Sequence, residues 1–327
     1  MNAREPKNEF GLVTTGNSDL VSRVLDRAVS DSVSTIYGPA LDLLRELIDE
    51  SALLQVRILT SGRRELAESV VAGGVFQRVL SLLDTAEVLL RAGQVFGARL
   101  VLRSLIEASW QVEWMLRADT ERRVRQFYVL DLRERVASNR AFIPGTQEQK
   151  TFQADVTDFA SWFTDRTEEA AKLNVKRVLE HMDEYPDLKE VDDEIAGQKK
   201  KIGDLRWFEL FDGPRSYADL ARKLQRGQEY RILYRGLSHA VHGSWLQNHF
   251  SVLAPGKGFV RPIRSLDKFA ETANPVWGVG LRVLRFVVLH FREGELPAFQ
   301  RRFFPNGKPR WNLPEVEIQE DLTLLGS

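Results

Sequence analysis

Residues 95–117 read VFGARLVLRSLIEASWQVEWMLR, and they constrain the architecture of this chain more than any other segment. Apolar side chains recur there with a period close to 3.6 residues, and they also fill most of the positions in between. A helix that is apolar on nearly every side leaves no face for solvent and is normally the central member of a bundle. The segment therefore predicts a buried central helix and an all-α fold.

Further helical segments surround this one in the sequence. Apolar residues at helical spacing predict amphipathic helices at about residues 41–56, 66–92, 121–140 and 275–291. The pair Gly73-Gly74 lies inside the second of these and marks a kink or a close helix crossing. The strand candidates, Val252-Leu253 and Phe259-Val260, are long enough for a small hairpin at most. We therefore expect a multi-helix bundle.

The 327 residues are expected to form one domain with appendages. Residues 1–20 are polar and predict a flexible lead-in, whereas residues 21–295 predict a single helical-bundle domain. Within it, residues 147–205 carry runs of charge and predict a polar helical arm or insertion. Residues 296–327 contain four prolines and predict an extended tail.

Composition excludes several classes of function. Lys+Arg and Asp+Glu both number 46, so a contact with nucleic acid must come from a local basic patch. The absence of cysteine excludes disulfides, thiolate metal sites and a cysteine nucleophile. No run approaches the roughly 20 apolar residues that span a bilayer, and the N-terminus lacks the apolar core of a signal peptide. We expect a cytoplasmic protein that does not contact membranes.

Residues 230–245, YRILYRGLSHAVHGSW, contain the main candidate site. In an α-helix of 100° per residue, four polar side chains fall within a sector of about 60°: those of Arg231, Arg235, Ser238 and His242. Tyr234 flanks this stripe, and His239 lies at its rim. Two guanidiniums, a hydroxyl and an imidazole on one side of a helix predict a site for an anionic substrate. The alternative is that these polar groups form part of the core, which would be energetically costly.

The central helix carries a second polar group, Arg103 and Glu107. One interpretation is a structural ion pair between residues i and i+4. The other is that Glu107 orients an Arg or His of the later helix and completes a polar pocket. No carboxylate follows His239, His242 and His249 at helical spacing, so we expect no metal and no cofactor.

Arg103-x-x-x-Glu107, followed far downstream by Tyr234-x-x-x-Ser238-x-x-x-His242, resembles the motifs of an uncharacterised bacterial all-helical family over roughly residues 60–250. More distantly, Arg235 and His242 are similar to the Arg–His motif of the HEPN superfamily of helical bundles, at the outer limit of its spacing. The sequence departs from that motif at Gly236, where the superfamily usually has a polar residue.

The HEPN resemblance implies a metal-independent endoribonuclease effector of a bacterial defence or toxin-type system, acting with a partner protein. His242, Arg235 and Ser238 would be catalytic: His242 as general acid or base at an RNA 2′-hydroxyl, and Arg235 against the charge on phosphorus. The remaining site residues would bind or orient RNA or a nucleotide; these are Arg231, Arg103, Glu107, Tyr234 and His239. The resemblance also implies a homodimer with a composite site.

Two other functions remain open. The rival to the ribonuclease is a non-catalytic scaffold, in which the cluster specifies the core. A third possibility is a sensor that uses the same pocket for a nucleotide or small anion without cleaving it. Burial separates these hypotheses, because an open site favours the ribonuclease and an Arg235 sealed against Glu107 favours the scaffold. The neutral net charge favours the scaffold or a small ligand.

Overall fold

The computed structural model of the protein describes residues 24–61, 65–156, 163–198, 200, 202–241, 250–254 and 257–316, and it describes no side chains for 239–241, 250–254 and 257–260. The described residues form an all-α multi-helix bundle, as predicted. The predicted lead-in over residues 1–20 lies outside them. None of the helices in these ranges is long and apolar enough to cross a membrane.

The Cα positions group into two compact units. The first contains residues 1–63, 72–113 and 224–327, and the second contains residues 64–71 and 114–223. The segment 147–205, predicted as a polar arm, lies within the second unit. The single domain expected over residues 21–295 stays a prediction.

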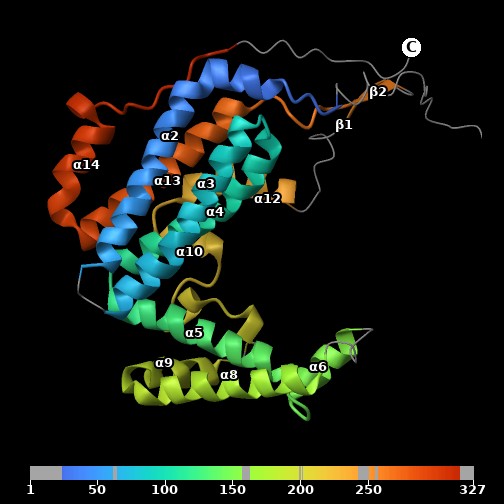
Figure 1. The fold of residues 1–327 in the computed structure, drawn as a ribbon, viewed down its shortest axis with the longest axis vertical. Coiled ribbons are helices and arrows are strands. Elements are labelled where there is room, and N and C mark those ends of the chain that lie inside the picture. The colour runs from blue at the N-terminus through green and yellow to red at the C-terminus, as the bar shows by residue number, and fades with distance from the viewer. Residues whose placement is uncertain are drawn as a thin grey trace, which may run out of the picture. The chain divides into compact units, whose positions relative to one another are not determined.

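Three helices form the centre of the first unit: α2 (Val29–Leu59), α3 (Phe76–Arg91) and α13 (Phe269–Phe291). Each packs against the other two (Figure 1). Gly280 permits the close approach of α13, because a Cβ atom there would lie 2.9 Å from Leu83 Cδ2 and 3.1 Å from Leu47 Cδ2. Leu47 and Leu83 are themselves buried, so these contacts belong to the core.

Helix α4 spans Val95–Arg117, the bounds that the sequence predicts. It is buried on nearly every side, which confirms its expected place in the core. Its fully buried side chains include Leu105, Ile106, Ala108, Trp110 and Val112.

Two helical segments have π rather than α geometry: η1 (Glu68–Val75) and η4 (Tyr230–Tyr234). The first contains the Gly73-Gly74 pair, where the sequence predicts a kink or crossing. The second follows α11 (Gly227–Glu229) and precedes α12 (Arg235–Val241). The prediction of one regular α-helix from residue 230 is therefore wrong for its first turn, because a π-helix bonds residue i to i+5 and changes the angular spacing of side chains.

Two short strands, β1 (Phe250–Ala254) and β2 (Lys257–Val260), pair as an antiparallel hairpin. Val252 stands opposite Gly258, and the register is irregular between Val252 and Ala254. The predicted small hairpin is confirmed.

The segment after α13 is not extended throughout, and the prediction of an extended tail is wrong for its first part. Helix α14 spans Leu296–Phe303, followed by the 3-10 turn η7 (Pro305–Gly307). Pro297 lies in the first turn of α14, where its missing N–H leaves no hydrogen bond unmade. Phe299 and Phe303 are buried and anchor the helix. The predicted tail from residue 317 onward lies outside the described residues.

The second unit is built on α5 (Thr120–Arg140). Helices α8 (Asp165–Glu184) and α9 (Pro186–Gly197) pack along it (Figure 1), and α6 (Gln147–Asp155) contacts it as well. Arg133 of α5 makes a bidentate ion pair with Asp192 of α9. The unit also contains η2 (Ile202–Asp204), η3 (Trp207–Glu209) and α10 (Tyr217–Lys223).

Candidate functional site

Four of the predicted site residues meet in one hydrogen-bonded network between α4 and the η4–α12 segment. Arg103 donates through Nε to Ser238 Oγ at 3.2 Å and through its NH2 group to the Tyr234 hydroxyl at 3.1 Å. The Tyr234 hydroxyl donates to Glu107 Oε1 at 2.6 Å, and Arg103 pairs with the same oxygen at 3.3 Å. Ser238 in turn donates to the Tyr234 carbonyl at 3.0 Å. The predicted ion pair of Glu107 with Arg103 is confirmed. The residue of the later segment that Glu107 contacts is Tyr234, whereas the other interpretation expected an Arg or a His there.

Tyr234 is the centre of this network. Its side chain is buried, and burial together with the hydrogen bond to the Glu107 carboxylate raises the pKa of its hydroxyl well above the ordinary 10.0. The Arg103 guanidinium opposes that shift and also lies over the ring, 5.0 Å from its centroid. Tyr234 is consequently a neutral phenol and a hydrogen-bond donor at any physiological pH.

An aromatic group adjoins the network. Trp110 is fully buried on α4, with its ring 5.3 Å from that of Tyr234 and 6.3 Å from that of Tyr230. The two tyrosines stack on each other at 5.3 Å. Stacked and tilted pairs at these separations add stability beyond the buried area, so the aromatic residues hold η4 against α4.

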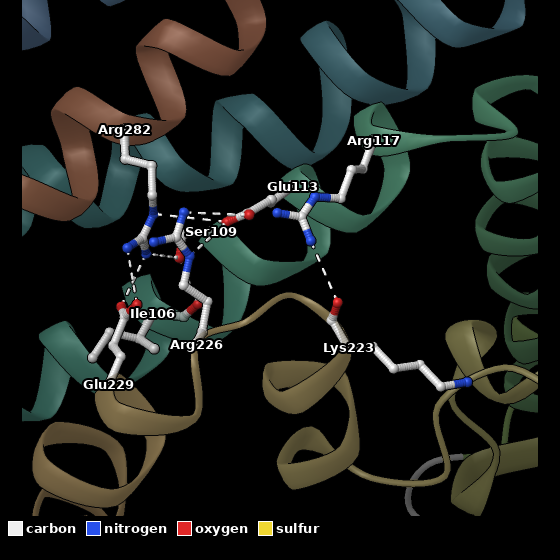
Figure 2. Close-up of polar contacts among 8 residues, drawn as sticks. All are labelled: Ile106, Ser109, Glu113, Arg117, Lys223, Arg226, Glu229 and Arg282. Atoms are coloured by element: carbon white, nitrogen blue, oxygen red, sulfur yellow. Dashed lines mark hydrogen bonds and ion pairs between the residues drawn. The ribbon is translucent and has the colours of Figure 1, made fainter.

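A second network, which the sequence did not predict, lies further along α4 (Figure 2). Arg226 donates to both carboxylate oxygens of Glu113, at 3.2 and 3.3 Å, and Glu113 is only 1% exposed. Arg282 of α13 donates to both oxygens of Glu229 at 2.9 Å and to Ser109 Oγ at 3.1 Å. Its Nε lies 3.9 Å from Glu113 Oε2. Two arginines and two glutamates thus balance one another in a largely buried site.

The two networks join the same pair of segments at different points. Ser109 and Glu113 lie near the Arg226–Glu229 end, whereas Arg103 and Glu107 lie near the Tyr234–Ser238 end. The segment from residue 226 to residue 238 therefore runs antiparallel to α4 and is fixed to it at both ends. The sequence contains one indication of the second network, because Arg282 and Arg285 are the charged residues in the apolar run 276–289. The partners of Arg282, Glu229 and Ser109, lie far away in the chain and had no such signal.

One protein-family model matches residues 69–257, more than half of the chain. The chain belongs to the family of unknown function DUF5677. The matched region contains both polar motifs, and the predicted membership of an uncharacterised helical family is confirmed. No curated protein and no solved structure matches the chain.

In this DUF5677 protein, Arg231 and Arg235 lie apart from the network. Both side chains are exposed, and no ion pair or hydrogen bond of either side chain is recorded within the described part of the chain. The two arginines thus take no part in the network of Ser238, and their place in one site with it stays a prediction. Glu107 already pairs with Arg103, so another guanidinium in that pocket would lack a counter-charge.

The histidine side chains predicted for the site lie outside the described part of the structure. The structure describes the backbone of His239 but not its side chain, and His242 and His249 lie beyond the described residues. Among the residues it does describe, no group of three or more potential ligands is placed to hold a metal ion. The expectation of no metal at the histidine cluster stays a prediction.

Proposed function

We propose that this DUF5677 protein is a metal-independent endoribonuclease, with His242 and Arg235 as the catalytic pair. The observation that supports the proposal is the exposure of Arg231 and Arg235. They lie on a helical segment that hydrogen bonds to α4 hold in place. Neither has a carboxylate partner among the described residues. Exposed guanidiniums without an acidic partner are available to bind phosphate oxygens.

In the proposed reaction, His242 takes the proton of an RNA 2′-hydroxyl and the 2′ oxygen attacks the adjacent phosphorus. The bond from phosphorus to the 5′ oxygen breaks, and that oxygen leaves as a hydroxyl after gaining a proton from water. Arg235 stabilises the negative charge on the phosphorane, and Arg231 holds a neighbouring phosphate. The products carry a 2′,3′-cyclic phosphate and a 5′-hydroxyl, and no metal takes part.

The network behind the helix has a positioning role in this proposal. Ser238 accepts a hydrogen bond from Arg103 and donates one to the Tyr234 carbonyl, so we assign it to positioning instead of the catalytic role expected from the sequence. Glu107 and Tyr234 hold the same helix, so we assign them to positioning as well. His239 stays a candidate for RNA binding on the strength of the sequence alone.

Cleavage rates test the proposal. Mixed RNA is incubated in EDTA with wild type, His242→Ala, Arg235→Gln and the control Arg78→Gln. Arg78 is an exposed arginine of α3 for which no partner is recorded in the described ranges, so its variant removes the same charge elsewhere. We expect both site variants to lose about 100-fold or more in rate and Arg78→Gln to keep the wild-type rate. Equal rates in all four proteins would refute the assignment.

The proposal extends to the assembly and the biological setting. Following the HEPN resemblance, we propose a homodimer whose two copies contribute to one site, and a cytoplasmic role with a partner protein in bacterial defence or a toxin-type system. These parts rest on the resemblance and not on the geometry.

One observation favours a second candidate, a non-catalytic scaffold or a nucleotide sensor. The Arg103–Glu107–Tyr234–Ser238 network is closed, with its hydroxyls bonded inside it, as expected of a group that specifies a core. If wild type leaves RNA intact while Glu107→Gln lowers the melting temperature, the scaffold replaces the ribonuclease.

A further inference from the structure

A cavity of about 820 Å³ lies between α13, α14 and the η7 turn, within the first unit, and none of its lining residues belongs to either network. Its volume is in the range of small-molecule sites. Two arginines line it, Arg285 of α13 and Arg301 of α14, together with the amide side chains of Gln300 and Asn306. Phe299, which is buried, and Phe304, which is half-buried, add aromatic surface.

The charge in this cavity is one-sided, because two cations and no acidic side chain line it. Both arginines are exposed, and neither has a recorded ion pair within the described ranges. The neighbouring Arg302 contrasts with them, since it pairs with Glu46 at 2.6 Å and also with Glu50. Arg302 therefore has a structural role as a link between α14 and α2. Arg285 and Arg301 have no such ion pair with any residue that the structure describes.

Two of the carboxylates near α14, Glu295 and Glu46, already have partners. Glu295 pairs with Arg57 at 2.9 Å, and Glu46 pairs with Arg310 at 3.0 Å as well as with Arg302. Among the described residues, no carboxylate is thus recorded as a partner of the two arginines of the cavity. Guanidiniums bind phosphate and carboxylate oxygens in a bidentate manner, and they bind them best where the surroundings are partly apolar.

We propose that this cavity binds a small aromatic oxyanion, with its phosphate or carboxylate on Arg285 and Arg301 and its ring against Phe304. Gln300 and Asn306 supply donors and acceptors for polar atoms at the edge of the ring. The proposal is independent of RNA cleavage, because no residue of the cavity belongs to the site assigned to that reaction.

Titration calorimetry with phenyl phosphate, benzoate, inorganic phosphate and phenol tests the proposal. We expect phenyl phosphate or benzoate to bind more tightly than inorganic phosphate and phenol, and the better of the two identifies the oxyanion. Arg285→Gln and Arg301→Gln should each weaken that binding by about tenfold, the loss of one charge-assisted hydrogen-bonding group. Lys308→Gln is the matched control, because Lys308 is an exposed cation next to the cavity that does not line it.

Three outcomes would overturn the inference. The first is that none of the four probes binds to the folded wild-type protein. The second is that inorganic phosphate or phenol binds as tightly as the aromatic anions, since either result removes half of the proposed recognition. The third is that Lys308→Gln weakens binding as much as the two arginine variants, which would reveal a general attraction of anions to this surface. Circular dichroism of each variant confirms that it is folded.

Discussion

At the scale of single residues, buried charge dominates the interior next to α4. Glu113 is 1% exposed and contacts two arginines, Arg226 and Arg282. A carboxylate that has lost its water is stabilised only by such partners, and its removal leaves their charges uncompensated. The stability of this region therefore depends on a few charged atoms as well as on apolar contact.

Glu113→Gln should lower the free energy of unfolding by about 3 kcal/mol, since it leaves Arg226 without a counter-charge in a largely buried site. The measurement is urea unfolding followed by circular dichroism. Glu180→Gln is the control, because Glu180 pairs with Lys176 on an exposed face and should cost less than about 1 kcal/mol. Similar losses in the two variants would contradict the structural importance of the network.

Tyr234→Phe isolates the phenol at the centre of the first network. The folded pKa of Tyr234 lies above its ordinary value of 10.0. Above that pH the unfolded tyrosine ionises while the folded one stays protonated, so its contribution to stability is complete below pH 10 and declines as the pH rises. We expect wild type to exceed Tyr234→Phe by about 1 kcal/mol at about pH 8 and by less at about pH 11. A difference that grows with pH would show the opposite shift.

The sequence predicted part of this residue-scale arrangement. Arg103, Glu107, Tyr234 and Ser238 were assigned to one site and do meet, because the i,i+4 spacing on two helices placed each pair on one face. Glu113 and Arg226 were missed, since they lie 113 residues apart and nothing local links them. The sequence left open whether Arg235 is exposed or sealed against Glu107, and the structure shows both Arg231 and Arg235 exposed.

At the scale of helices, apolar periodicity was the reliable guide. It gave the bounds of α4 and, within a residue, those of α5, where Asp119-Thr120 begins a new helix. It did not give α14, because Pro297 was taken as a mark of extended chain although proline is common in a first helical turn. It could not reveal η1 and η4, since π segments depend on packing as well as on residue type.

Gly280→Ala tests the close packing of α13. The new methyl group would lie 2.9 Å from Leu83 Cδ2 and 3.1 Å from Leu47 Cδ2, so we expect a loss of about 1 to 3 kcal/mol in the free energy of unfolding. Gly278→Ala on the same helix has no atom within 4 Å of its new Cβ, and it should be neutral or stabilising by up to about 1 kcal/mol. Equal effects in urea unfolding would contradict the packing argument.

At the scale of the whole molecule, the formal net charge is zero, so positive charge that could bind RNA must come from local patches. Such a protein gains little from general attraction to RNA, and specific contacts must supply the binding. In the proposed homodimer, both copies contribute residues to one composite site. Light scattering should therefore give twice the chain mass of 37.4 kDa, and a mass equal to one chain would contradict the composite site.

The most direct test of the central claim is the chemistry of the RNA ends after incubation with the wild-type protein in EDTA. The account predicts new 2′,3′-cyclic phosphates and 5′-hydroxyls, which mass spectrometry of the fragments identifies, and their absence with His242→Ala. Intact RNA, or fragments with 5′-phosphates, would contradict the account.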